Sequence, residues 1–145
     1  MTVETYLKQG IFLDRRIKYQ LQRIAELRAS ASDIAAPALK ADKVQTSSTG
    51  EARFVKALEK VDEIQEQVNR ELNDLLALKK QIEGVIHQVG NEEYELVLSY
   101  RYLQNKSWAE IADQLYVGKT TVKRWHGKAI QMIVLPEHPI IWNAC

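Results

Sequence analysis

A heptad pattern across residues 51–89 constrains the fold of this chain more than any other feature of its sequence. Its positions recur in alternating steps of four and three residues, and all but two of them are apolar. They are Phe54, Leu58, Val61, Gln65, Val68, Leu72, Leu75, Lys79, Ile82, Ile86 and Val89. At about 1.5 Å per residue, the pattern predicts one helix of about 60 Å. Because a helix this long with a single apolar stripe is not stable alone, another helix has to cover the stripe.

A first long helix is predicted from Thr2 to about Ser30. Its apolar stripe consists of Leu7, Leu13, Ile17, Leu21, Ile24 and Leu27. Residues 31–50 contain Pro37 and the run Gln45-Thr-Ser-Ser-Thr-Gly50 without an apolar period, which predicts a flexible linker. Residues 1–90 are therefore expected to fold as a long antiparallel helical hairpin, a coiled coil, with the linker at residues 31–50.

The width of the apolar stripe also favours oligomerisation. Leu76, Leu78 and Val85 extend it beyond a simple two-stranded seam. We expect a homodimer through the hairpin, as in a four-helix bundle, and a monomeric hairpin is the alternative. The heptads accommodate two, three or four strands, and the polar positions Gln65 and Lys79 constrain that number without fixing it.

Residues 91–135 carry the pattern of a helix-turn-helix domain. Ser107 and Glu110 have the spacing of a capping box, so a helix is expected to begin at Trp108. A break at Tyr116-Val117-Gly118 follows, and Gly118 is the residue expected to accept unusual backbone angles there. The helix after the break would bury Val122, Trp125, Ala129, Ile130 and Ile133. A preceding helix, ending near Leu103, would bury Leu96, Val97, Tyr100 and Leu103.

The helix after the break is basic on its outer face, with no acidic residue from Lys119 to Lys128. The N-terminal end of the second helix of such a motif lies in the DNA major groove. Base contacts are therefore expected from Lys119, Thr120, Thr121 and Arg124. Phosphate contacts are expected from Lys123, Lys128, Arg101 and Lys106.

The overall charge says little about partners, because the chain has a net charge of +1 and 6 basic and 6 acidic residues follow Gly90. Any affinity for double-stranded DNA would thus come from a local basic surface and would fall with salt.

Other classes of function find no support in the sequence. His87, His126 and His138 are scattered, Cys145 is the only cysteine, and there is no glycine-rich phosphate loop. We therefore expect no enzyme activity, no metal site and no cofactor. We also expect a cytoplasmic protein, because the sequence shows neither a signal peptide nor a membrane span.

The run Leu-Val-Leu-Ser-Tyr-Arg-Tyr-Leu-Gln-Asn-Lys-Ser-Trp-Ala-Glu-Ile-Ala at residues 96–112 resembles region 4, the promoter-binding C-terminal domain of bacterial sigma factors. The resemblance covers about 40 residues and implies a helix-turn-helix. Two departures stand out. Tyr116 occupies the position of that family's usual turn glycine, and Trp125-His126-Gly127 replaces its usual Arg-Leu-His.

The layout of residues 5–131 also resembles a group of uncharacterised proteins from phages and prophages of Gram-positive bacteria. The residues that carry this match are 103–108 and His126-Gly127-X-Ala129. The resemblance implies a phage-encoded transcription regulator, akin to activators of late genes.

Together these patterns predict a dimeric, sequence-specific DNA-binding regulator of transcription. The alternative is a protein-interaction module that binds RNA polymerase or another regulator, with the coiled coil as a scaffold. Residues 136–145 form a tail after Pro136 and Pro139, in which Ile140, Ile141 and Trp142 make an apolar plug. The plug is expected to pack on the helix-turn-helix, or else to dock a partner protein.

Overall fold

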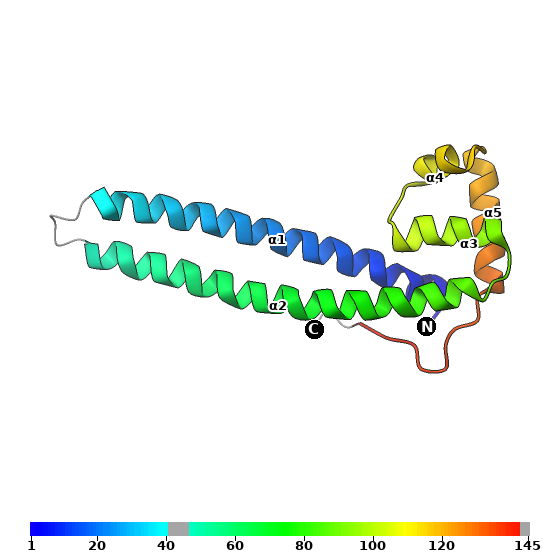
Figure 1. Cartoon of the computed structure of the whole chain (residues 1–145), viewed down its shortest axis with the longest axis horizontal. Helices are drawn as coiled ribbons and strands as arrows, with labels where there is room; N and C mark the ends of the chain where they lie inside the picture. Colours follow the sequence, from blue (N-terminus) through cyan, green and yellow to red (C-terminus); the bar gives the residue numbers. More distant parts are fainter. Residues whose placement is uncertain (41–46, 143–145) are drawn as a thin grey trace. The chain divides into compact units, whose positions relative to one another are not determined.

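The computed structural model of the protein describes residues 1–40 and 47–142, and throughout these ranges its regular structure is helical, without a strand. The prediction of an all-α protein is confirmed. The elements are α1 (Val3–Lys40), α2 (Ser47–His87), α3 (Glu92–Leu98), the π-helical turn η1 (Ser99–Leu103), α4 (Trp108–Leu115) and α5 (Lys119–Met132), as shown in Figure 1.

The linker prediction is wrong over most of its length. Helix α1 continues through Lys40 and α2 already begins at Ser47, so residues 31–40 and 47–50 are helical. The physical reason is composition, since the segment that follows Arg28 is rich in alanine, the residue with the highest helix propensity. Residues 41–46, the rest of the predicted linker, lie outside the described residues.

The chain divides into two compact units at positions that differ from the predicted domain boundary. One unit comprises Met1–Asp14 and Asp74–Cys145, and the other comprises Arg15–Asn73. In each unit a segment of α1 lies antiparallel to a segment of α2 (Figure 1). The first unit combines the start of α1 and the end of α2 with the predicted helix-turn-helix residues, because these segments share one core. Its buried members are Tyr6, Leu7, Leu78, Ile82, Val85, Ile86, Val89, Leu98, Tyr102, Ala129 and Ile133.

The heptad prediction has the correct period, and Ile86 is buried as predicted, but Ile64, Glu71 and Leu78 are buried in place of the predicted Gln65, Leu72 and Lys79. The buried residues of α2 are Val61, Ile64, Val68, Glu71, Leu75, Leu78, Ile82, Val85, Ile86 and Val89. Gln65 and Lys79 are only partly covered and Leu72 is 41% exposed. Two heptad registers are possible in α2, and both contain Val61, Val68 and every seventh residue after them. Packing selects the phase with Ile64, Leu78 and Val85, because it places more apolar side chains in the core.

On α1 the same kind of shift exchanges two neighbours. Gln20 is buried, whereas Leu21, predicted for the stripe, is 47% exposed. The polar break in the α2 seam is Glu71, whose Oε1 accepts hydrogen bonds from Arg16 Nε at 2.7 Å and Gln67 Nε2 at 3.2 Å. Glu71 Oε2 and Gln20 Oε1 accept no hydrogen bond from the part of the chain that the structure describes. The unit Arg15–Asn73 thus contains a polar layer in an otherwise apolar seam.

The segment before α4 buries Val97 as expected, with Tyr100 and Leu103 packed against the cores, but it also buries Leu98 and Tyr102. Val97, Leu98 and Tyr102 are buried, while Tyr100 and Leu103 are half-buried and Leu96 is exposed. After α3 the chain forms the π-helical turn η1, in which the amide of Gln104 donates to the carbonyl of Ser99, five residues earlier. A π-turn changes the rotation per residue relative to an α-helix, so Tyr102 within it reaches the core although a regular helical period does not place it there.

Helices α4 and α5 are joined by Tyr116-Val117-Gly118. The predicted capping box of Ser107 and Glu110 is present at the start of α4. The left-handed residue of the turn is Tyr116, with φ 56° and ψ 40°, whereas Gly118 has ordinary extended angles. The prediction that Gly118 supplies the unusual backbone angles is therefore wrong. Behind the turn, Val97, Ile111, Ala112 and Val122 form a second small core.

The tail is held by α1 and α2 through two glutamine side chains. Gln9 accepts from the amide of Trp142 at 2.8 Å and donates to the carbonyl of Ile140 at 3.0 Å. Gln81 accepts from the amide of Ile140 at 2.9 Å and donates to the carbonyl of His138 at 3.1 Å. The plug was expected to pack on the helix-turn-helix, and Ile140 does pack against a core that contains Ala129 and Ile133, but the hydrogen bonds of the tail go to the long helices, to which both glutamines belong. Residues 143–145 lie outside the described residues.

Candidate nucleic-acid interface

The side chains of α5 divide cleanly between a buried and an exposed face. Val122 and Ala129 are completely buried, and Trp125 and Ile130 are half-buried. The exposed residues are Lys119, Thr120, Lys123, Arg124, Gly127, Lys128, Gln131 and Met132. Of the four residues predicted to contact bases, Lys119, Thr120 and Arg124 are exposed, and Thr121 is half-buried at the edge of the face.

The rotation of an α-helix, about 100° per residue, orders this exposed face. Thr120, Arg124, Gly127 and Gln131 follow one another along a line opposite Val122 and Ala129. Lys123 lies on one side of that line and Lys128 on the other. We name Thr120, Arg124, Gly127 and Gln131 the outward line of α5. Gly127 and Gln131 are absent from the sequence-based prediction, although their helical spacing from Thr120 would have indicated them.

The cations on this face form no ion pair among the residues that the structure describes. Lys119, Lys123, Arg124 and Lys128 form no ion pair with any residue in ranges 1–40 and 47–142. Four positive charges are thus exposed on one helix with no counter-charge paired to them in the described part of the chain. Such a face attracts an anionic partner.

The other two predicted phosphate contacts are held differently. The Arg101 guanidinium lies 4.3 Å from the centre of the Trp108 ring, and its Nη1 donates to the carbonyl of Lys106 at 3.1 Å. The Lys106 ammonium lies 6.0 Å from the centre of the Tyr100 ring. Both side chains are half-buried, so packing restricts their directions before any ligand binds.

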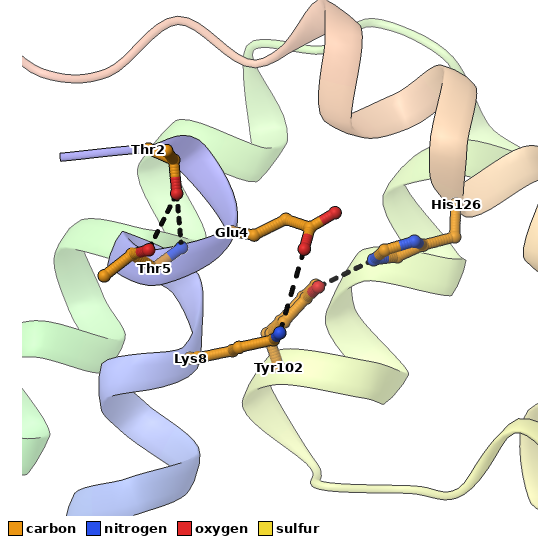
Figure 2. A network of polar contacts seen from close by, with 6 residues as sticks. All are labelled: Thr2, Glu4, Thr5, Lys8, Tyr102 and His126. Atoms are coloured by element: carbon orange, nitrogen blue, oxygen red, sulfur yellow. Dashed lines mark hydrogen bonds and ion pairs between the residues drawn. The ribbon is translucent and has the colours of Figure 1, made fainter.

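A polar cluster lies beside the buried face of α5. The Tyr102 hydroxyl and His126 Nε2 are 2.6 Å apart, and the edge of the Trp108 ring contacts the His126 ring at a centroid distance of 4.8 Å. Figure 2 shows this pair with the first turns of α1, where Lys8 and Glu4 form an ion pair of 3.7 Å. The cluster thus connects α1, η1 and α5 in one compact unit.

The electrostatics of the cluster favour uncharged side chains. Burial lowers the pKa of His126; Glu4 opposes this effect, and Arg101 and Lys8 add to it. Burial also raises the pKa of Tyr102 to about 12, with a smaller contribution from Glu4. Near neutral pH the hydrogen bond therefore joins a neutral imidazole to a protonated phenol.

Two further features bear on the classes of function considered above. No group of three or more His, Cys, Asp or Glu side chains in the described ranges could hold a metal ion. None of the helices described is both long enough and apolar enough to cross a membrane.

Comparison with known proteins places the chain in a family. No curated protein and no solved structure matches it. The model of one family, described as Protein of unknown function (DUF722), matches residues 16–134, which is more than half of the chain. The protein belongs to the DUF722 family.

Proposed function

We propose that this protein is a sequence-specific DNA-binding regulator of transcription. In this proposal α4, the turn and α5 form a helix-turn-helix of the sigma region 4 type, and α5 lies in the major groove. The observation that carries the proposal is the exposed face of α5, where an outward line of residues is flanked by Lys123 and Lys128, both unpaired within the described chain.

This arrangement fits the shape of duplex DNA. The major groove is about 12 Å wide, which admits one α-helix, and its walls are the two phosphate backbones. A helix in the groove directs its outermost residues to the bases and the residues on either side to phosphates. Thr120 and Arg124 lie where a residue would face the bases, and Lys123 and Lys128 lie where a residue would face the phosphates. Arg101 and Lys106, fixed near the start of α4, supply further phosphate contacts.

The long helices supply the second half of the proposal. A single recognition helix contacts few base pairs, whereas a dimer contacts two half-sites at a fixed spacing. We propose that α1 and α2 form a helical hairpin through which two copies associate. Support comes from large apolar side chains that the unit Arg15–Asn73 leaves exposed, namely Tyr19, Leu21, Val55, Leu58 and Leu72. Such a regulator would be phage-encoded and would act in the cytoplasm.

A second candidate function is suggested by Tyr116. Its side chain is 94% exposed at the tip of the turn between α4 and α5. An exposed aromatic side chain held in a left-handed turn is suited to a protein contact, such as one with RNA polymerase. In this alternative, α4 and α5 bind a protein and the long helices act as a scaffold.

Selection of bound fragments from random duplex DNA tests the proposal, with the mass of the purified protein measured alongside. We expect an enriched inverted repeat and a dimeric mass. Arg124→Ala should cost about 1–3 kcal/mol on the enriched site, whereas Lys123→Ala should weaken binding to all DNA and reduce the salt slope by about one. A protein that enriches no DNA sequence at low salt is not such a regulator, and the polymerase alternative would then be tested by co-purification.

A further inference from the structure

Resting on the proposed function, we propose that the DNA-contacting surface of α5 extends to its third turn. Gly127 allows the duplex to approach the helix backbone closely, and Gln131 contacts a base edge beyond it. Neither residue belongs to the set expected from the sequence, in which the base contacts end at Arg124 and Lys128 contacts phosphate. The proposal adds one positioning residue and one specificity-determining residue to the interface.

The argument for Gly127 begins with its cost to the helix. A glycine in a helix interior destabilises the helix relative to alanine. Gly127 is exposed, and a Cβ atom built on it would meet no other atom within 4 Å. Nothing in the described chain therefore requires a glycine at this position. Glycine is also used where another molecule comes close to the helix backbone. Gly127 lies on the outward line, which faces the proposed duplex.

The argument for Gln131 is one of position and chemistry. It follows Gly127 by four residues and Thr120 by eleven, so the three lie along one line of the helix surface. At about 1.5 Å per residue, Thr120 and Gln131 are on the order of 16 Å apart along the axis. That length corresponds to about five base pairs at about 3.4 Å each.

Gln131 is also chemically free to contact DNA. It is exposed, and it forms no side-chain hydrogen bond with the described residues. A glutamine amide can donate from its nitrogen to N7 of adenine and accept at its oxygen from the N6 amino group in the major groove. The neighbouring Lys128 would contact phosphate, so Gln131 is the residue that would distinguish bases at the C-terminal end of the outward line.

The experiment measures affinity and sequence preference of the full chain for four variants and the wild type. Gly127→Ala and Gln131→Ala are the test variants. Gly84→Ala is the matched control for the first, because Gly84 is an exposed glycine in α2 whose added Cβ would also meet nothing within 4 Å. Gln88→Ala, at an exposed glutamine outside α5, is the control for the second. Thermal unfolding of each variant reports whether the fold is retained.

We expect Gly127→Ala to bind the selected DNA at least about tenfold more weakly while its melting temperature is unchanged or higher. Gln131→Ala should lose a preference for adenine at one position of each half-site and keep the other positions. Both controls should bind as the wild type does.

Either an unchanged affinity of Gly127→Ala or an unchanged selected sequence of Gln131→Ala overturns this inference. If Arg124→Ala still weakens binding in that case, the proposed function stands without it. If the wild-type protein selects no DNA sequence, the inference and the proposed function fail together.

Discussion

His126 of α5 contacts the Tyr102 hydroxyl, and its pKa makes the stability of this contact depend on pH. An imidazole in an unfolded chain has a pKa of about 6.5, and burial lowers the pKa of His126 in the folded protein. The unfolded state therefore binds the proton first as the pH falls. Stability is fully present above about pH 6.5 and decreases below it, until the pH passes the folded pKa.

We expect the urea midpoint of the wild type to be lower at pH 5 than at pH 7.5, and His126→Gln to reduce this difference. His87 and His138 remain in the variant, so the comparison isolates position 126. Equal pH dependence in the two proteins would show that His126 does not couple protonation to folding.

Tyr116 is a second residue at which the local structure makes a clear prediction. A left-handed backbone costs a residue with a side chain roughly 1–2 kcal/mol, and glycine avoids that cost. Because the Tyr116 side chain is 94% exposed, little packing is lost on its removal. Tyr116→Gly should raise the free energy of unfolding by about 0.5–1 kcal/mol, after allowance for the greater freedom of glycine in the unfolded chain. Tyr116→Ala keeps the backbone cost and should leave the free energy of unfolding unchanged. If alanine raised it as much as glycine does, the left-handed backbone of Tyr116 would not be the source of the effect.

At the scale of the element, the polar layer of α1 and α2 decides how their seam responds to substitution. The Glu71 side chain is only 8% exposed, and Arg16 covers it. Arg16→Met would leave a buried carboxylate without its cation and should cost about 2–4 kcal/mol. Glu71→Leu in the same chain should recover most of this loss, because an apolar side chain continues the seam. Urea unfolding of the wild type, both single variants and the double variant measures the coupling, and additive effects would contradict it.

The elements also show how far the sequence allows prediction. The capping box of α4 and the buried face of α5 follow from local spacing, and both were predictable. The phase of the α2 seam was not, because Val61, Val68, Leu75, Ile82 and Val89 fit two heptads, and only the packing partner distinguishes them. The π-turn at Ser99–Leu103 has no signal in the hydrophobic period. The base-contacting part of the candidate site was predicted only as far as Arg124, since Gly127 and Gln131 were not placed on the same line.

At the scale of the whole molecule, the proposed DNA-binding residues do not have a complete core of their own. Leu98, Tyr102, Ala129 and Ile133 pack in the same cluster as Tyr6, Leu7, Leu78 and Ile82, which belong to the ends of α1 and α2. Asn105 also donates to Asp14 at 2.8 Å, and Gln9 and Gln81 hold the tail. The predicted boundary at residue 90 therefore cuts through a core rather than between two cores.

A fragment of residues 91–145 should consequently fail to fold, although it contains all the predicted helix-turn-helix. Its remaining small core of Val97, Ile111, Ala112 and Val122 is too small to offset the chain entropy of folding. We expect low helicity by circular dichroism and no cooperative thermal transition. A variant of the full chain in which Leu7 and Leu78 are both alanine is the matched test, because it changes no residue of the fragment and weakens the core that the fragment shares with α1 and α2. This variant should lose the protection of α5 amides from hydrogen exchange, and full protection in it would show that residues 91–145 form an autonomous domain.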